Sequence, residues 1–183
     1  MERIKTIGAR IPRIDSMDKV LGKAVYSGDI KLPGMLCGKI LKSPFPHARI
    51  KSIDISKAKR VAGVKAVVTA DDIERKRIGV IMEDEPILAI GKVRYVGERI
   101  AAVAAVDEDA AQEALSLIKV EYEHLKPVFD SLEAIEAGAP LVHDDLFAEG
   151  KAQNMGIEGN ICSSMEVPVG DLEQGLKESD YIF

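Results

Sequence analysis

The sequence predicts an α+β fold, and three observations carry this prediction. Short apolar runs separated by Gly and Pro are typical of strands joined by turns. One helix is indicated by an apolar stripe at the spacing i, i+3, i+4, i+7, formed by Ala111, Ala114, Leu115 and Ile118. Strand-like runs at 99–106 and 119–123 flank this helix directly, which predicts a right-handed βαβ unit within a mixed sheet.

The first seventy residues read as short strands divided by turns. Strands are expected at 24–30 (AVYSGDI), 35–43 (MLCGKILKS), 48–55 (ARIKSIDI) and 64–70 (VKAVVTA). Gly38 breaks the alternation of its strand, so a bulge or bend is expected there. Ser56 is a suitable N-cap for a short helix at 57–61, which Gly63 would end. A further helical turn is expected at 70–76 (ADDIERK).

Two apolar runs, VRYV at 93–96 and RIAAVAAV at 99–106, flank the pair Gly97–Glu98. The second run is rich in small residues, which suits a central strand covered on both faces. Gly97 permits a bend that a residue with a Cβ would resist. Glu98 is a lone charge between apolar runs, and we expect it to accept hydrogen bonds from the bend or to pair with Arg94 or Arg99. The alternative is a place at an interface with a larger catalytic body.

The character of the chain changes after residue 130, which predicts a domain at 1–130 and a looser segment at 131–183. This segment reads as a short helix at 131–138, a polar, glycine-dotted linker or exposed loop at 143–160, a strand at 164–170 and a weak helix at 170–180. A strand begins at Tyr181 and is cut at Phe183, so we expect the chain to be the front piece of a longer protein.

Composition narrows the class of protein. The chain has 183 residues, 46% of them hydrophobic and 30% charged, which is typical of a globular domain. Its net charge of −5 argues against nucleic acid as a partner. Because no apolar run approaches the roughly 20 residues of a membrane helix, and the N-terminus lacks a signal peptide's apolar core, we expect a cytoplasmic protein without a membrane partner.

The sequence contains no recognisable catalytic or cofactor motif. Gly91 and Gly97 do not form a phosphate-binding loop, and the turn after the strand at 99–106 carries three carboxylates (VDEDAA), which would repel a phosphate. The cysteines and histidines lack the spacing of metal ligands: Cys37, Cys162, His47, His124 and His143. The residues alone therefore predict a catalytically silent scaffold.

Four stretches occur together in the order and at the spacing of a known family: 11–30, 43–73, 93–115 and 118–130. They resemble the N-terminal α/β hammerhead domain of the molybdenum-binding large subunit of xanthine dehydrogenase and aldehyde oxidase-type hydroxylases, including carbon monoxide dehydrogenase and 4-hydroxybenzoyl-CoA reductase relatives. The resemblance covers roughly residues 8–130 and implies a bent hammerhead hairpin. The tail resembles the bridge into a molybdopterin-binding domain.

The resemblance implies an oxidoreductase that uses a molybdenum-pterin cofactor, with [2Fe–2S] clusters and FAD on other domains or subunits. The family's pterin-binding loops and catalytic glutamate lie downstream and map onto none of positions 1–183. The isolated chain is thus expected to bind no cofactor, to be inactive, and to pack against the molybdopterin-binding domain, an iron–sulfur subunit and an FAD subunit, or to form a homodimer. The prolines of SPFPHARI at 43–50 would set a rigid, extended loop from which Phe45 and His47 could project. The residues proposed for such contacts are Phe45, His47, Glu98, Tyr181 and Phe183. The alternatives are a free-standing interaction or ligand-binding module with the hammerhead fold, and an independent small enzyme.

Overall fold

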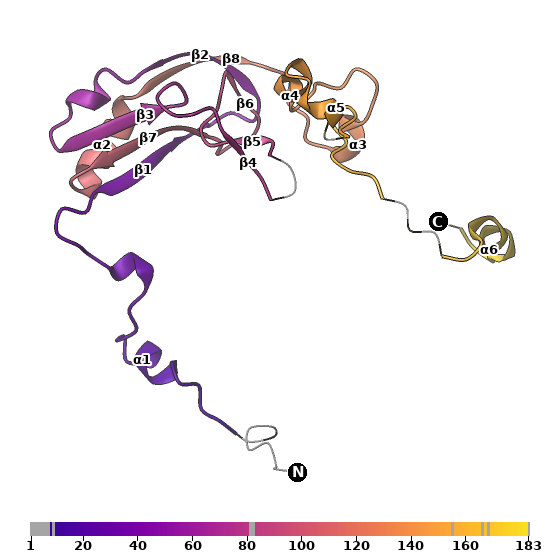
Figure 1. Ribbon diagram of the computed structural model, residues 1–183, viewed down its shortest axis with the longest axis horizontal. Helices are drawn as coiled ribbons and strands as arrows, with labels where there is room; N and C mark the ends of the chain where they lie inside the picture. The colour runs from indigo at the N-terminus through magenta and orange to yellow at the C-terminus, as the bar shows by residue number, and fades with distance from the viewer. Residues whose placement is uncertain are drawn as a thin grey trace. The chain divides into compact units, whose positions relative to one another are not determined.

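The computed structural model describes residues 8, 10–80, 83–154, 156–165, 167 and 169–182. The chain divides into two compact units, Met1–Leu36 and Cys37–Phe183 (Figure 1). The first unit contains helix α1 (Ser16–Val20) and the 3₁₀ turn η1 (Ser27–Asp29). This turn replaces the strand expected at 24–30.

The second unit is built on two three-stranded sheets. One has the order β1-β7-β3, formed by β1 (Cys37–Lys42), β7 (Arg99–Ala105) and β3 (Val64–Thr69). The other has the order β6-β2-β8, formed by β6 (Lys92–Val93), β2 (Ala48–Asp54) and β8 (Lys119–His124). A two-residue pair adds β4 (Arg77–Ile78) and β5 (Glu85–Pro86). Every strand pairing among the described residues is antiparallel.

The remaining helical elements are short, apart from α2 (Glu108–Leu117). They are the 3₁₀ turn η2 (Ala58–Arg60), α3 (Ser131–Ala134), α4 (Asp144–Ala148), α5 (Lys151–Asn154) and α6 (Leu172–Glu178). None of the helices in the described part of the chain combines the length and apolar character needed to cross a membrane.

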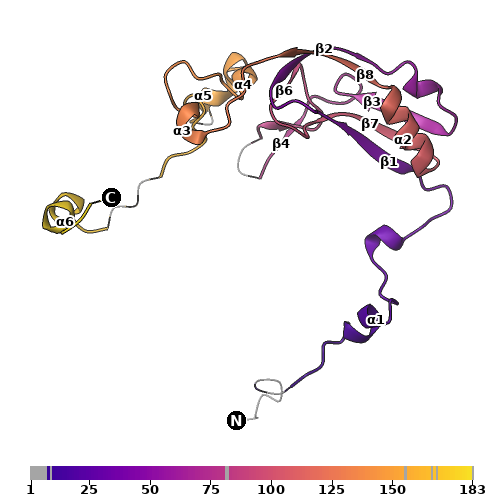
Figure 2. The same ribbon diagram turned by 180° about the vertical axis from the view of Figure 1, so that it is seen from behind.

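Helix α2 covers one face of the β1-β7-β3 sheet (Figure 2). Its buried residues Ala111 and Ala114 pack with Ala101, Val103 and Ala105 of β7 in one apolar cluster. A second cluster surrounds the fully buried Ile100 and includes Ala48, Ala89 and Val93. Small side chains let the helix approach the sheet closely, so this contact fixes the position of α2.

Asp107 caps helix α2. Its side chain accepts a hydrogen bond from the backbone N–H of Ala110 at 2.8 Å, as N-cap residues do. The sequence allows either Asp107 or Asp109 as the cap, and the structure selects Asp107. Glu108 and Asp109 then lie in the first turn, where the helix dipole favours negative charge.

The α+β class is confirmed, but the βαβ unit in a mixed sheet is wrong. Strands β7 and β8, on either side of α2, belong to different sheets. The reason is that β1 and β3 already occupy both edges of β7, so β8 pairs antiparallel with β2 instead. The helix therefore carries the chain from one sheet to the other.

Several local predictions also need correction. The expected helix at 70–76 is a turn, held by the Asp72 carboxylate, which accepts hydrogen bonds from the backbone N–H and hydroxyl of Thr69 at 2.8 and 2.9 Å. The run 93–96 contributes only Val93 to a strand. The bulge expected at Gly38 lies between Leu41 and Lys42. No strand forms at the described positions of 164–170 or at 181–182.

Gly63 holds a position that other residues could not adopt without strain. Its φ is +87°, and an added Cβ would lie 2.7 Å from Cγ2 of Val106. The Val106 N–H also donates a hydrogen bond to the Gly63 carbonyl at 2.9 Å. Gly63 therefore fixes the turn before β3 against the junction of β7 and α2.

Replacing this glycine tests the packing. We expect Gly63→Ala to lower the free energy of unfolding by about 2 kcal/mol, from backbone strain and overpacking against Val106. Gly38→Ala is the matched control, because its φ is not positive and its added Cβ would meet nothing within 4 Å. Urea unfolding measures both variants, and equal losses would contradict the account.

Candidate functional site

The bend at 95–97 separates β6 from β7 and is held to the end of β1. Gly97 has a φ of +99°, which favours glycine. Its N–H donates to the Ser43 carbonyl at 2.8 Å, and the Ser43 N–H donates to the Glu98 carbonyl at 2.8 Å. The bend predicted from Gly97 is present, and it places Glu98 at the start of the central strand.

Glu98 forms a buried ion pair with Arg94. One guanidinium nitrogen donates to its carboxylate at 2.9 Å, the backbone N–H of Arg94 donates to the other oxygen, and both side chains are only 3% exposed. Burial raises the pKa of Glu98, and the contacts to Arg94 partly oppose this. The sequence indicates Arg94 or Arg99 as the partner, and the structure selects Arg94. Arg99 pairs with Glu85 at 2.6 Å.

Arg94 also reaches Asp145 on helix α4, at 2.9 Å. Arg77, another buried arginine, contacts the same carboxylate oxygen at 2.7 Å and Glu149 at 2.9 Å. We call these five residues the arginine cluster: Arg77, Arg94, Glu98, Asp145 and Glu149. Although burial acts to raise the pKa of Asp145, the two guanidiniums hold this pKa below its ordinary value.

The arginine cluster corrects the expectation of an exposed linker at 143–160. Helix α4 is tied to the sheets through Asp145, and Lys92 of β6 adds a contact to Asp144 at 2.6 Å. Leu146, which follows these two acidic residues, is fully buried. The acidic residues at 144–149 therefore form ion pairs with the body, whereas residues 148–151, 156 and 158–159 are exposed, as expected for a loop.

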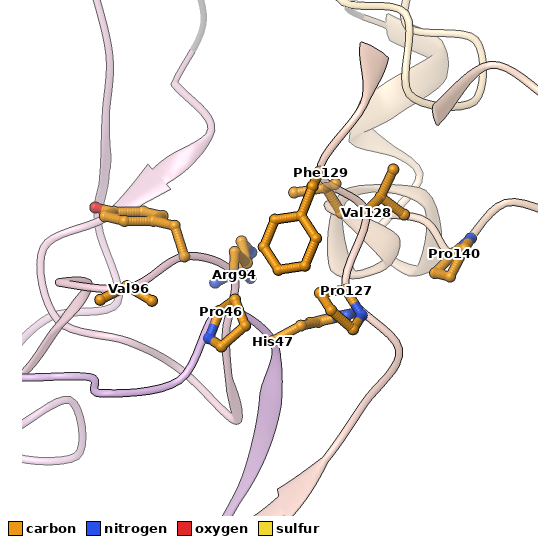
Figure 3. Close-up of a pocket in the computed structure, with 10 residues that line it drawn as sticks. Pro46, His47, Arg94, Val96, Pro127, Val128, Phe129 and Pro140 are labelled. Carbon is orange, nitrogen blue, oxygen red and sulfur yellow. The ribbon is translucent and has the colours of Figure 1, made fainter. Parts of the chain in front are cut away.

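A hollow of about 280 Å³ lies beside Arg94 (Figure 3). Pro46 and His47 come from the segment leading into β2, and Pro127 and Phe129 from the segment after β8. The Phe129 side chain is 82% exposed. His47 Nδ1 lies 2.8 Å from the Lys126 carbonyl, an acceptor, so this nitrogen carries the proton. The hydrogen bond fixes the ring at the edge of the hollow.

The five residues proposed for contacts with a partner do not form one surface. His47 and Glu98 lie near each other through Arg94, which lines the hollow and binds Glu98. Phe45 does not project: its ring packs edge-on against Tyr122 and His124, with centroid distances of 4.9 and 4.4 Å. Tyr181 is 81% exposed. Phe183 lies outside the described residues.

Sequence reasoning missed Arg77, Asp145 and Glu149. Their contacts span about seventy positions, and the only local signal was a helix-capable acidic run at 144–149. Within the described part of the chain, no group of three or more His, Cys, Asp or Glu could hold a metal ion. The cluster joins each buried guanidinium to two carboxylates, an arrangement that anchors one segment to another.

Fold and site together define a small α+β domain in which helix α4 is anchored to the sheets by partly buried ion pairs. The aldehyde oxidase and xanthine dehydrogenase a/b hammerhead domain matches residues 21–126. The chain belongs to this family, and the resemblance found in the sequence is confirmed.

Two curated relatives and one solved structure illustrate the similarity. The chain is 40% identical over 172 residues to a probable xanthine dehydrogenase subunit of Bacillus subtilis, covering 93% of this chain and 21% of the relative. It is 37% identical over 179 residues to the nicotinate dehydrogenase large molybdopterin subunit of Eubacterium barkeri, covering 97% and 39%. Reconstituted CO dehydrogenase from Oligotropha carboxidovorans matches with a TM-score of 0.69 and 40% identity, covering 73% and 17%. The chain thus spans only about a fifth to two fifths of these curated relatives.

Removing the shared carboxylate tests the anchor. We expect Asp145→Ala to lower the free energy of unfolding by on the order of 3 kcal/mol, because two buried guanidiniums lose a partner. Glu136→Ala removes the same charge from an exposed position on the same segment, and should change stability by less than about 0.5 kcal/mol. Urea unfolding provides the measurement. Indistinguishable variants would show that the cluster does not hold α4.

The Asp145 contribution should also depend on pH. Because its folded-state pKa is lowered, the stabilisation is present above the unfolded-state pKa of about 3.9 and is lost as the pH falls through the lower folded-state pKa. His143 and Glu98 titrate nearby, so the quantity to follow is the stability difference between wild type and Asp145→Asn. Urea midpoints from about pH 6 to about pH 3 should show this difference shrinking only below about pH 4. A constant difference would contradict the lowered pKa.

Proposed function

We propose that this chain is the hammerhead scaffold of the large subunit of a molybdenum-containing hydroxylase of the xanthine dehydrogenase and aldehyde oxidase type. Its function is to pack against the rest of that subunit rather than to catalyse the reaction. The observation that carries the proposal is the coverage: nearly all of this chain aligns with relatives that are much longer. The arginine cluster supports it, because its buried charges pair with one another and fix structure.

The cofactors of the parent enzyme belong to the same proposal. One relative is named a large molybdopterin subunit. The described residues of this chain do not fit a metal centre, since no suitable group of ligands occurs among them. Because this chain covers only 39% of that relative, we place molybdenum-pterin in the remaining large-subunit polypeptide, and [2Fe–2S] clusters and FAD on other domains or subunits. The expected partners are that polypeptide, the iron–sulfur subunit and the FAD subunit.

The domain boundary at residue 130 remains a proposal. Residues 131–183 would bridge into the molybdopterin-binding domain, with α4 held to the body by Arg77 and Arg94. The second candidate function, a free-standing interaction or ligand-binding module, is supported by the hollow around Arg94 and Phe129.

Co-expression separates the two functions. A tagged copy of this chain would be produced together with the part of the Bacillus subtilis relative that lies beyond its match to this chain. Under the scaffold proposal the two polypeptides copurify and elute as one complex in size-exclusion chromatography, whereas the tag alone retains nothing. Separate elution of two well-folded polypeptides would refute the scaffold function and favour the free-standing module.

A further inference from the structure

The central strand β7 has an uncovered face. It is paired on both edges, by β1 and β3, and α2 covers the side that carries Ala101, Val103 and Ala105. On the opposite side, Ala102 and Ala104 remain partly exposed even though their strand is central. The exposure of these alanines shows that nothing among the described residues of the second unit covers this side of the sheet at their positions.

The strand register extends the uncovered area across three strands. Ala104 lies between Gly38 of β1 and Ala66 of β3, and Ala102 lies between Ile40 and Val68. Directly opposed residues share a face of an antiparallel sheet. We call these six residues the open face: Gly38, Ile40, Ala66, Val68, Ala102 and Ala104. Ile40 is 45% exposed, and no residue of the open face is polar.

A sheet face without polar residues is unusual for a face that is in contact with water. An antiparallel strand with one solvated face alternates apolar and polar residues, whereas a strand buried on both faces reads as a continuous apolar run. β7 is continuous from Ile100 to Ala105. At its start β7 bulges opposite the step from Leu41 to Lys42, so Ile100 turns to the covered side, where it is fully buried and packs with Ala89 and Leu41. The open face therefore begins beyond the bulge, at Ala102.

We infer that the open face is the docking surface for an apolar helix supplied by the remaining polypeptide of the large subunit. This inference rests on the proposed function and names the contact through which it operates. In the solved CO dehydrogenase the matched region is only 17% of the chain, so protein that could cover this face is present in such enzymes.

The shape of the open face favours this occupant over a second copy. Two stacked sheets lie about 10 Å apart, and side chains from both must fill the gap. Gly38, Ala66 and Ala104 contribute at most a methyl group each, so two copies placed face to face would leave the gap unfilled. A partner must bring large side chains. Three strands by two rows of residues measure roughly 10 by 7 Å, the footprint of a single helix.

Charges placed on the open face test the inference. The variants are Ile40→Lys on the edge strand β1, which is easier to accommodate, and Ala102→Asp at the centre. Ile78→Lys is the matched control, since Ile78 is an exposed isoleucine of strand β4 at 40% exposure, close to that of Ile40. Each is tested for binding to the Bacillus subtilis polypeptide described above, after circular dichroism and urea unfolding have shown a native fold.

We expect both open-face variants to weaken binding at least about tenfold, because a charge would be buried in an apolar contact, while Ile78→Lys binds as wild type. Wild-type binding that survives Ile40→Lys and Ala102→Asp would overturn the docking face and leave the proposed function standing. Absence of wild-type binding would overturn both. A wild-type dimer that these variants convert to monomer would identify a second copy as the occupant and overturn the helix.

Discussion

The pairing of β7 on both of its edges is the constraint on which the rest of the second unit depends. With β1 and β3 in place, neither edge of β7 is free for the strand that follows α2, and β8 pairs with β2 in the other sheet. Helix α2 then lies on the sheet it leaves, with its alanines against those of β7. The bend before β7 brings Glu98 to the start of the same strand. Helix packing, sheet order and the buried charge all follow from one strand's position.

The arginine cluster links the start of β7 to helix α4. Burying charges is costly, and a buried pair is weak evidence for net stability, but an unpaired buried charge is costlier still. Arg94 is fixed beside Glu98, and its guanidinium also binds the carboxylate of Asp145. Arg77 binds the same carboxylate. The cluster therefore specifies where α4 lies. Arg94 also borders the hollow, so the position of that surface depends on the same contacts.

The features that can be predicted from the sequence depend on local signals, and those that cannot depend on contacts between residues distant in the sequence. The strands at 37–42, 48–54, 64–69 and 119–124 and the helix at 108–117 are predictable because their signals are local periodicities. The pairing of Glu98 with Arg94 is accessible because only four positions separate them. Membership of β7 and β8 in different sheets is not, since it depends on which edges are already occupied. Asp145 looks solvated in the sequence because its partners lie about fifty and seventy positions earlier. Phe45 is expected to project because its prolines suggest a rigid exposed loop, whereas its packing partners, Tyr122 and His124, are distant in sequence.

One failed expectation is itself informative. The small, apolar residues of β7 predict a strand covered on both faces, and the structure covers one. The apolar pattern of a strand reflects the environment in which the strand functions. The exposed fraction of its residues reflects only the cover that this chain itself provides. The two agree where the chain supplies its own cover, as beneath α2. They disagree at Ala102 and Ala104, and cover supplied by the rest of a large subunit, as proposed above, would account for the difference. Under this proposal the face is exposed only when the domain is separated from its partner, and the apolar pattern of β7 matches its environment in the assembled subunit.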